Sequence, residues 1–299
     1  MFFGELAALA TSVCFSATST FFTFAGRQVG SVVVNRTRLV LAVFLLTAAH
    51  LLLGTPLPLH AASERWFWLS ISGIIGLVLG DAFLFQAFIW IGPRLSMLLM
   101  ALAPILASIM AWLFLDEILS LIQISGILLT VAGIAWVVLE QNGQRKVSKL
   151  DTRNYILGIL CGLGGAAGQA LGLITAKKGL GGDFPALSGT LMRMLAATVA
   201  LWGFTLIQGQ ARVTFKQLAS KRQVSWLILG GAFTGPFLGV TFSLVAIQHT
   251  QVGIASTLMA LPPVILLPVG YFVFKERFGW QAILGTFVAM AGVGLLFLI

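Results

Sequence analysis

Charged residues are scarce in this sequence: Asp, Glu, Lys and Arg make up 9% of its 299 residues, whereas 59% are hydrophobic. A soluble domain uses about 25% charged residues to cover its surface, so the composition excludes an ordinary soluble protein. Apolar runs recur along the whole chain, and each is about the 20 residues needed to cross the hydrocarbon core of a bilayer. The composition therefore predicts a polytopic membrane protein.

Residues that form disulfides or bind metals are also scarce. The two cysteines, Cys14 and Cys161, fall inside apolar runs, where a small buried side chain is the expected role. The three histidines lie near the ends of runs without ligand-like spacing. Neither a nucleophile–base constellation nor a basic stripe with interleaved aromatics is found. The sequence therefore predicts no metal, no cofactor, no enzyme activity and no nucleic-acid partner.

The apolar runs do not alternate with period two, which excludes a closed barrel and favours helices. No soluble domain fits between the runs, and the stretch MFFGE is expected to open the first span because it lacks the positive charge of a signal peptide. Ten spans are predicted, at about 3–24, 31–53, 66–90, 94–115, 118–139, 154–177, 185–208, 224–247, 250–274 and 278–299.

A proline-containing motif occurs twice. Met-Ala-Leu-x-Pro stands at Met100–Pro104 and again, 159 residues later, at Met259–Pro263. Because prolines, glycines and charged residues rarely match by chance between apolar helices, their recurrence in one order indicates an internal duplication. The same offset pairs Glu117 with Glu276, Gly126 with Gly285, Gly133 with Gly292, Gly76 with Gly235 and Gly80 with Gly239, and a shift of two residues pairs Arg36 with Arg193.

The duplication divides the chain into two halves. We predict a first five-helix repeat over residues 1–139, a polar linker over 140–153 and a second five-helix repeat over 154–299. Because each half has an odd number of spans, the second enters the membrane from the opposite side, which makes an inverted repeat.

The distribution of basic residues predicts the orientation in the membrane. Most of the 18 lysines and arginines fall in loops after odd-numbered spans, on the face opposite both termini. The positive-inside rule predicts that these loops are cytoplasmic and that both termini lie outside. The net charge of +9 is then explained by topology and anionic lipid.

Two long stretches carry a resemblance to a known family. Residues Met100–Ile134 and Met259–Val293 share the spacing E-x8-G-x6-G after the proline motif. They resemble the EamA family of the drug/metabolite transporter superfamily, and the resemblance covers the whole chain. It implies an all-α fold of ten transmembrane helices in two inverted five-helix repeats around a central cavity. It also implies a multi-pass protein of the inner (plasma) membrane that exports or exchanges small metabolites such as amino acids.

Ionisable residues within the spans are the strongest functional signal, because each costs several kcal/mol in hydrocarbon unless it is paired or hydrated. Asp81 lies near the middle of span three, and Arg36 and Arg38 lie at nearly the same depth in span two. We therefore predict an Asp81–arginine pair, which is either a structural ion pair or part of a site for substrate binding or proton coupling. Arg193 is the repeat counterpart of Arg36, but Asp81 falls opposite Val240. An unmatched carboxylate favours a site for an asymmetric substrate, and the arginines suit one that bears a carboxylate.

Polar residues and prolines within the spans supply weaker candidates. Each polar side chain could instead be satisfied by the preceding turn of its own helix. Pro104 and Pro263 would bend spans four and nine around the cavity and act as hinges, or would merely shape the packing. The polar candidates are Ser16, Gln86, Trp90 and Gln169, with Ser12, Ser19, Thr241 and Gln248 behind them.

Together these features predict a secondary transporter that moves small organic metabolites across the membrane by alternating access, in the direction of export. A lipid-scrambling or structural membrane protein without a small-molecule substrate is the alternative. A channel is less favoured, because twin proline-containing spans within an inverted repeat suit alternating access.

Overall fold

The computed structural model describes residues 3–103, 105–106, 109, 120–144, 149–181, 184–249, 258–275 and 279–295. These residues are almost entirely helical, and no strand occurs among them. Six helical stretches are long and apolar enough to cross a membrane. Helices α5, α7, α14 and α15, whose bounds follow, lie at the positions of the other four predicted spans. The predicted all-α fold of two five-helix repeats is confirmed.

The helices of the two halves follow the same order. The first half contains α1 (Phe3–Val29), α2 (Ser31–Leu52), η1 (Pro58–His60), α3 (Ser63–Ser72), η2 (Gly73–Gly80), α4 (Asp81–Ile91), α5 (Pro93–Met100) and α7 (Leu121–Gln144). The second half contains α8 (Lys149–Gly179), α9 (Ala186–Ile207), α10 (Ala211–Ser220), α11 (Arg222–Ala232), η3 (Phe233–Gly239), α12 (Val240–His249), α14 (Pro262–Phe272) and α15 (Trp280–Leu295). The α3–η2–α4 series forms span three, and the α11–η3–α12 series forms span eight.

The helices extend into the segment predicted as a linker. Helix α7 runs to Gln144 and α8 begins at Lys149, so little of residues 140–153 lies between helices. Glu, Gln and Lys are good helix formers, so the two helices extend beyond the apolar runs into this polar segment. Its role as the join between the two repeats stays a prediction.

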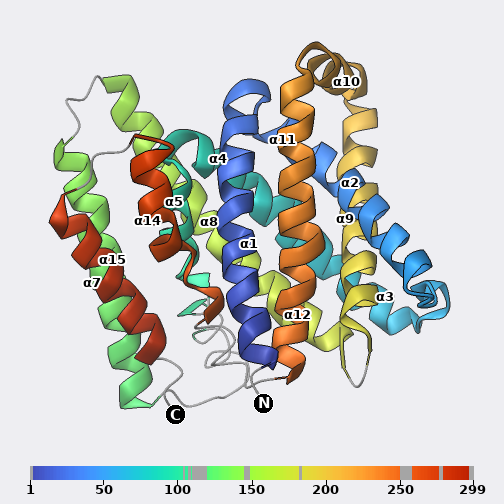
Figure 1. Ribbon diagram of the computed structural model, residues 1–299, viewed down its shortest axis with the longest axis horizontal. Helices are drawn as coiled ribbons and strands as arrows, with labels where there is room; N and C mark the ends of the chain where they lie inside the picture. Colours follow the sequence, from blue (N-terminus) through green and yellow to red (C-terminus); the bar gives the residue numbers. More distant parts are fainter. Residues whose placement is uncertain are drawn as a thin grey trace.

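The arrangement of helix ends agrees with the loop assignment. The first turn of α1 and the last turn of α15 lie at one end of the molecule, and α10 lies at the other (Figure 1). The residues that belong to the α10 end are Arg27 near the end of α1, Arg212 and Lys216 on α10, Lys221 before α11 and Arg222 at the start of α11. This is the face that the charge distribution predicts to be cytoplasmic.

Spans three and eight share a feature that the sequence analysis did not predict. In each, an α-helix widens into π-helical turns, η2 and η3, which end at Gly80 and Gly239. These two glycines match at the repeat offset. Pro236, which lacks a backbone N–H, lies inside η3. Because π-helical turns are rare and occur often at functional sites, the matched pair points to the middle of these two spans.

Glycines allow two pairs of helices to pack backbone to backbone. A Cβ atom built on Gly168 of α8 would lie 2.6 Å from the Cα of Gly80, so no larger residue fits there. Between α7 and α15, a Cβ on Gly133 would lie 2.5 Å from the backbone nitrogen of Ala289. These glycines therefore let neighbouring helices approach closely, as membrane helices require when no hydrophobic force drives them together.

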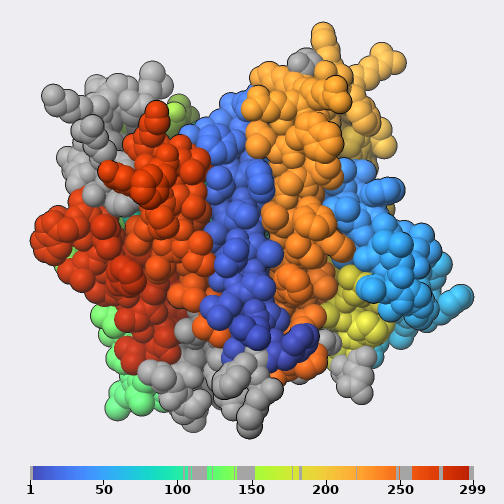
Figure 2. Space-filling model, in the orientation of Figure 1, coloured from blue at the N-terminus to red at the C-terminus, as the bar shows by residue number. Residues whose placement is uncertain are grey.

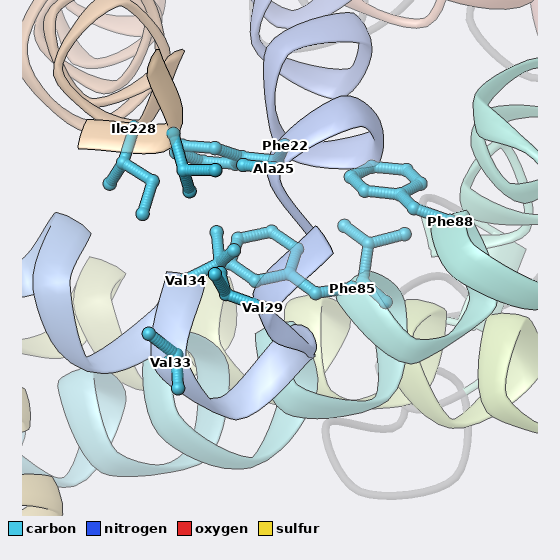
Figure 3. Close-up of a cluster of buried hydrophobic side chains, with 10 residues drawn as sticks. Phe22, Ala25, Val29, Val33, Val34, Phe85, Phe88 and Ile228 are labelled. Carbon is cyan, nitrogen blue, oxygen red and sulfur yellow. The ribbon is translucent and has the colours of Figure 1, made fainter. Parts of the chain in front are cut away.

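Aromatic and branched side chains from both halves form a buried cluster beside α1. Phe22 of α1 lies with its ring centroid 4.9 Å from that of Phe85 of α4, and Ile228 of α11 joins them from the second half (Figure 3). On the outside, α1 is exposed along its length between α14 and α11 (Figure 2). Large apolar side chains such as Phe44 and Phe272 are exposed, as a bilayer-facing surface requires.

Candidate functional site

An ion pair joins spans two and three. Arg38 of α2 donates a hydrogen bond from Nη2 to Oδ2 of Asp81, the residue at which η2 gives way to α4. The Arg38 side chain is 3% exposed and that of Asp81 14% exposed. Opposite charges at this depth offset part of each other's desolvation cost. The predicted Asp81–arginine pair is present, and Arg38 is the arginine.

The π-helical turns of η2 help to hold Arg38 in place. The Arg38 Nη2 atom also donates to the backbone oxygen of Leu77 at 3.0 Å, and Nε donates to Oδ1 of Asn35 at 3.0 Å. The amide of Asn35 in turn donates to the backbone oxygen of Val78 at 3.3 Å. The guanidinium carbon lies 4.8 Å from the ring centroid of Phe85. Arg38 is therefore held by hydrogen bonds and a cation–π contact, and its orientation is fixed before any ligand arrives.

A cavity of about 100 Å³ adjoins the ion pair and lies between the two halves of the chain. This is room for several water molecules or a small ligand. The rings of Phe22, Phe85 and Phe88 turn toward one another between α1 and α4 (Figure 3). The lining residues are Phe15, Thr18, Ser19, Phe22, Arg38, Leu77, Asp81, Leu84, Phe85, Phe88, Met97, Met100, Gln169, Gly235, Pro236 and Val240. The cavity is therefore mostly apolar with a few polar groups, as is usual for small-molecule sites.

A second arginine lies behind the cavity wall. Arg193 of α9 is 3% exposed, and its Nε atom has no hydrogen-bond partner among the described residues. Its Nη2 atom packs on Gly76 of η2, where a Cβ atom would lie 3.5 Å away. Its charge is attracted by Asp81. Arg193 therefore adds a second positive charge beside the ion pair, from the other half of the chain.

The family model described as the EamA-like transporter family matches residues 2–139 and 156–298, which is nearly the whole chain. The chain belongs to the EamA-like transporter family. Its two matched segments correspond to the two five-helix repeats, and members of this family are membrane transporters of the drug/metabolite transporter superfamily rather than enzymes. The protein is therefore a multi-pass membrane transporter in class.

Comparison with solved structures supports the same fold. Twenty-eight solved chains match this EamA-like chain. One of them, described only as "Crystal structure of protein", is 17% identical, aligns over 99% of this chain and 98% of its own, and has a TM-score of 0.67. At that identity the likeness shows the fold alone. No curated protein sequence matches the chain.

Arg36 lies away from the cavity in this EamA-like fold, which corrects the prediction that it belongs to the site. Its Nη1 atom donates to Oγ1 of Thr214 at 3.1 Å, and Nη2 donates to Oε1 of Gln210 at 2.7 Å. Arg36 and Arg38 are two residues apart, about 200° around a helix, so they point in nearly opposite directions at similar depth. Depth in the span is therefore not enough to choose between them.

The predicted polar candidates divide between the cavity and ordinary packing. Gln169 of α8 lines the cavity. Ser16 donates to the backbone oxygen of Ser12 at 2.7 Å in its own helix, the alternative that the sequence left open. Gln86 accepts a hydrogen bond from Ser31 at 2.6 Å, and Trp90 packs beside an apolar cluster. Asp81, Arg38, Gln169 and the weaker candidate Ser19 therefore line one cavity, whereas Ser16, Gln86 and Trp90 are not among its lining residues.

Two polar residues near the cavity were not among the candidates. Thr18 lines the cavity from α1, with its hydroxyl 2.8 Å from that of Thr234. Asn35 supports Arg38 from one turn earlier in α2. The signal for Asn35 was available, because a polar residue three positions before a buried arginine lies on the same helix face. Thr18 gave no signal that separates it from the other hydroxyl residues of α1.

Spans four and nine are interrupted at matching positions, and in span nine the interruption does not come from Pro263. Pro263 lies in the first turn of α14, where a proline removes no intrahelical hydrogen bond. The interruption comes just before, where Leu261 donates to Leu258 in an i to i−3 bond, as Leu102 does to Leu99. Pro104 lies outside the described residues.

Among the described residues, no three His, Cys, Asp or Glu side chains come close enough to hold a metal ion. The chemistry of the candidate site therefore rests on hydrogen bonding and charge from Asp81, Arg38 and Arg193.

Proposed function

We propose that this protein is a secondary transporter that exports small organic metabolites across the plasma membrane by alternating access. The observation that carries the proposal is the cavity between the two repeats, with the Arg38–Asp81 ion pair in its wall. Ionisable groups at membrane depth are costly, and they mark substrate or ion pathways in transporters.

The architecture supports alternating access. The cavity is lined by spans one to four and by spans six and eight, so relative movement of the two halves would change its exposure. The interruptions of spans four and nine lie at matched positions, where hydrogen bonds from residue i to residue i−3 replace the α-helical pattern. The π-helical turns of spans three and eight also face the cavity through Leu77, Gly235 and Pro236.

Asp81, Arg38 and Gln169 are the residues to which we assign substrate contact. Asp81 accepts one hydrogen bond from Arg38 through Oδ2, which leaves Oδ1 without a hydrogen-bond partner among the described residues. That oxygen is available to a substrate donor or to a coupling proton. The amide of Gln169, another lining residue, supplies both a donor and an acceptor.

Transport from proteoliposomes tests the proposal. The protein is reconstituted with a mixed internal pool of labelled amino acids, organic acids and nucleobases, with and without a pH gradient. Selective, saturable efflux of one class is expected, and Asp81→Asn should abolish it or remove its dependence on the gradient. Arg212→Gln, on the exposed side of α10, is the matched control and should transport normally. No efflux from folded protein would favour the lipid-scrambling or structural alternative, which a lipid-flip assay on the same vesicles would identify.

A further inference from the structure

The buried charges around the cavity do not balance. Arg38 lines the cavity and Arg193 lies behind its wall, and Asp81 is the sole acidic residue among the lining residues. We infer that the substrate is a monoanion with an apolar body, a carboxylate that carries no ammonium group. The inference rests on the proposed transport function and narrows its substrate class.

One nitrogen of the Arg38 guanidinium is free to bind the ligand. The Nε and Nη2 atoms of Arg38 are engaged by Asn35, Leu77 and Asp81, and Nη1 has no hydrogen-bond partner among the described residues. Since Arg38 is a lining residue, this nitrogen is the donor that a ligand carboxylate would meet. A charge-assisted bond to a fixed guanidinium is strong because the donor pays little entropy to form it.

Arg193, which lies behind the cavity wall, strengthens the preference for an anionic ligand. Its Nη2 atom lies against Gly76, next in sequence to the lining residue Leu77, and the Nε atom of this 3% exposed side chain is unpartnered in the described structure. A buried guanidinium without a full set of partners raises the free energy of the empty state. An anion in the cavity would lower it, because a charge is felt across a thin wall of low dielectric.

A zwitterion or a cation fits this arrangement less well. An ammonium group would need Asp81, whose charge is already shared between Arg38 and Arg193. It would also add a third positive charge to the group. A monoanion brings the summed charge of Arg38, Arg193, Asp81 and the ligand to zero, whereas a zwitterion leaves that sum positive.

The remaining lining selects for an apolar body. Phe15, Phe22, Phe85, Phe88, Met97 and Met100 supply aromatic and thioether surface to the rest of the lining. Such surface packs against an aryl or branched alkyl group and offers no partner for a polyhydroxylated one.

Three probes that share one aryl body separate these alternatives. Labelled phenylpyruvate is bound to the full chain in lipid nanodiscs, and phenylalanine and phenethylamine compete for the site. Binding avoids the leak of weak acids through vesicles. Phenylpyruvate should bind saturably, phenylalanine should compete about ten-fold more weakly, and phenethylamine should not compete. Binding of phenylalanine that equals or exceeds that of phenylpyruvate would overturn the inference while leaving the proposed transport function in place.

Variants of Arg193 link the preference to the charge. Arg193→Gln should weaken phenylpyruvate binding by about ten-fold and leave the weaker phenylalanine binding nearly unchanged, whereas Arg193→Lys should retain most of the affinity. Arg212→Gln is the control for a distant arginine. Equal loss for both probes, or none for either, in a variant shown to be folded by size-exclusion chromatography would contradict the role of the charge. If the wild type binds none of the probes, the inference fails, and efflux of the mixed metabolite pool decides the proposed function separately.

Discussion

Span three and span eight are repeat counterparts, yet they pack against their neighbours in different ways. Span three meets α8 through glycine on glycine. A Cβ atom on Gly168 would lie 2.6 Å from the Cα of Gly80, and one on Gly172 would lie 3.0 Å from the Cα of Gly76. Ser72 donates a hydrogen bond of 2.5 Å to the backbone oxygen of Gly172. This contact is closed, with backbone against backbone.

Span eight meets α1 through glycine on larger side chains. A Cβ atom on Gly235 would lie 2.6 Å from Cγ2 of Thr18, and one on Gly239 would lie 2.8 Å from Cε1 of Phe15. Gly235, Thr18 and Phe15 all line the cavity. The two contacts therefore show how a duplicated scaffold acquires an asymmetric site. Spans three and eight both carry glycines at the contact. The residue type on the partner helix, glycine on α8 but Thr18 and Phe15 on α1, decides whether the two backbones touch or are held apart.

The largest effect should come from filling the closed contact. Gly168→Ala places a methyl group against the backbone of Gly80, which cannot rotate away, so span three and α8 must separate. We expect a loss of stability of about 1–3 kcal/mol, measured as a lower melting temperature of the purified protein. Gly203→Ala on α9 is the matched control, since a Cβ atom there meets nothing within 4 Å. Equal melting temperatures for the two variants would show that the contact is not closed.

The next largest effect should come from giving the second half a carboxylate at the position that matches Asp81. Val240 is the counterpart of Asp81 and lines the same cavity. Val240→Asp adds a second carboxylate and cancels the positive surplus, so phenylpyruvate binding should fall by about ten-fold. Val240→Asn has a similar size without the charge, and it should bind far better than Val240→Asp in the same competition assay. A similar loss in both variants would assign the effect to shape instead.

The smallest effect should come from filling the open contact. Gly235→Ala creates the same close approach as Gly168→Ala, but its neighbour is the side chain of Thr18 rather than backbone, and a side chain can be shortened by substitution. We expect a loss of stability below about 1 kcal/mol, together with weaker ligand binding because the cavity narrows. Adding Thr18→Ala should restore the stability, which thermal melting of the double variant would measure. If Gly235→Ala lowers the stability as much as Gly168→Ala does, the two contacts do not differ in the way described.

The fold could be predicted because its signals are repeated along the chain. Apolar runs of membrane length recur throughout, and the motif at Met100–Pro104 returns at Met259–Pro263. The depth of Asp81 in its span was enough to expect an arginine partner. It was not enough to name that partner, because helix rotation, rather than depth, separates Arg38 from Arg36.

Other features depend on contacts that no local pattern records. The π-helical turns end at Gly80 and Gly239, but the same glycines would suit an ordinary α-helix in close packing, so spacing alone does not predict them. Gln86 and Gln169 are both polar residues within spans. One bonds Ser31 and the other lines the cavity, and only the arrangement of the helices decides which.

The bonds of Arg36 join the interior of the protein to its surface. Arg36 ties α2 to Gln210, the residue before α10, and to Thr214 of α10, and the indole N–H of Trp202 donates to the backbone oxygen of Arg36. Two residues further along α2, Arg38 holds Asp81 at the cavity. A shift of α2 during transport would therefore move α10 as well. A fluorophore on the exposed Lys216 of α10 would then report the conformation of the cavity from the aqueous phase.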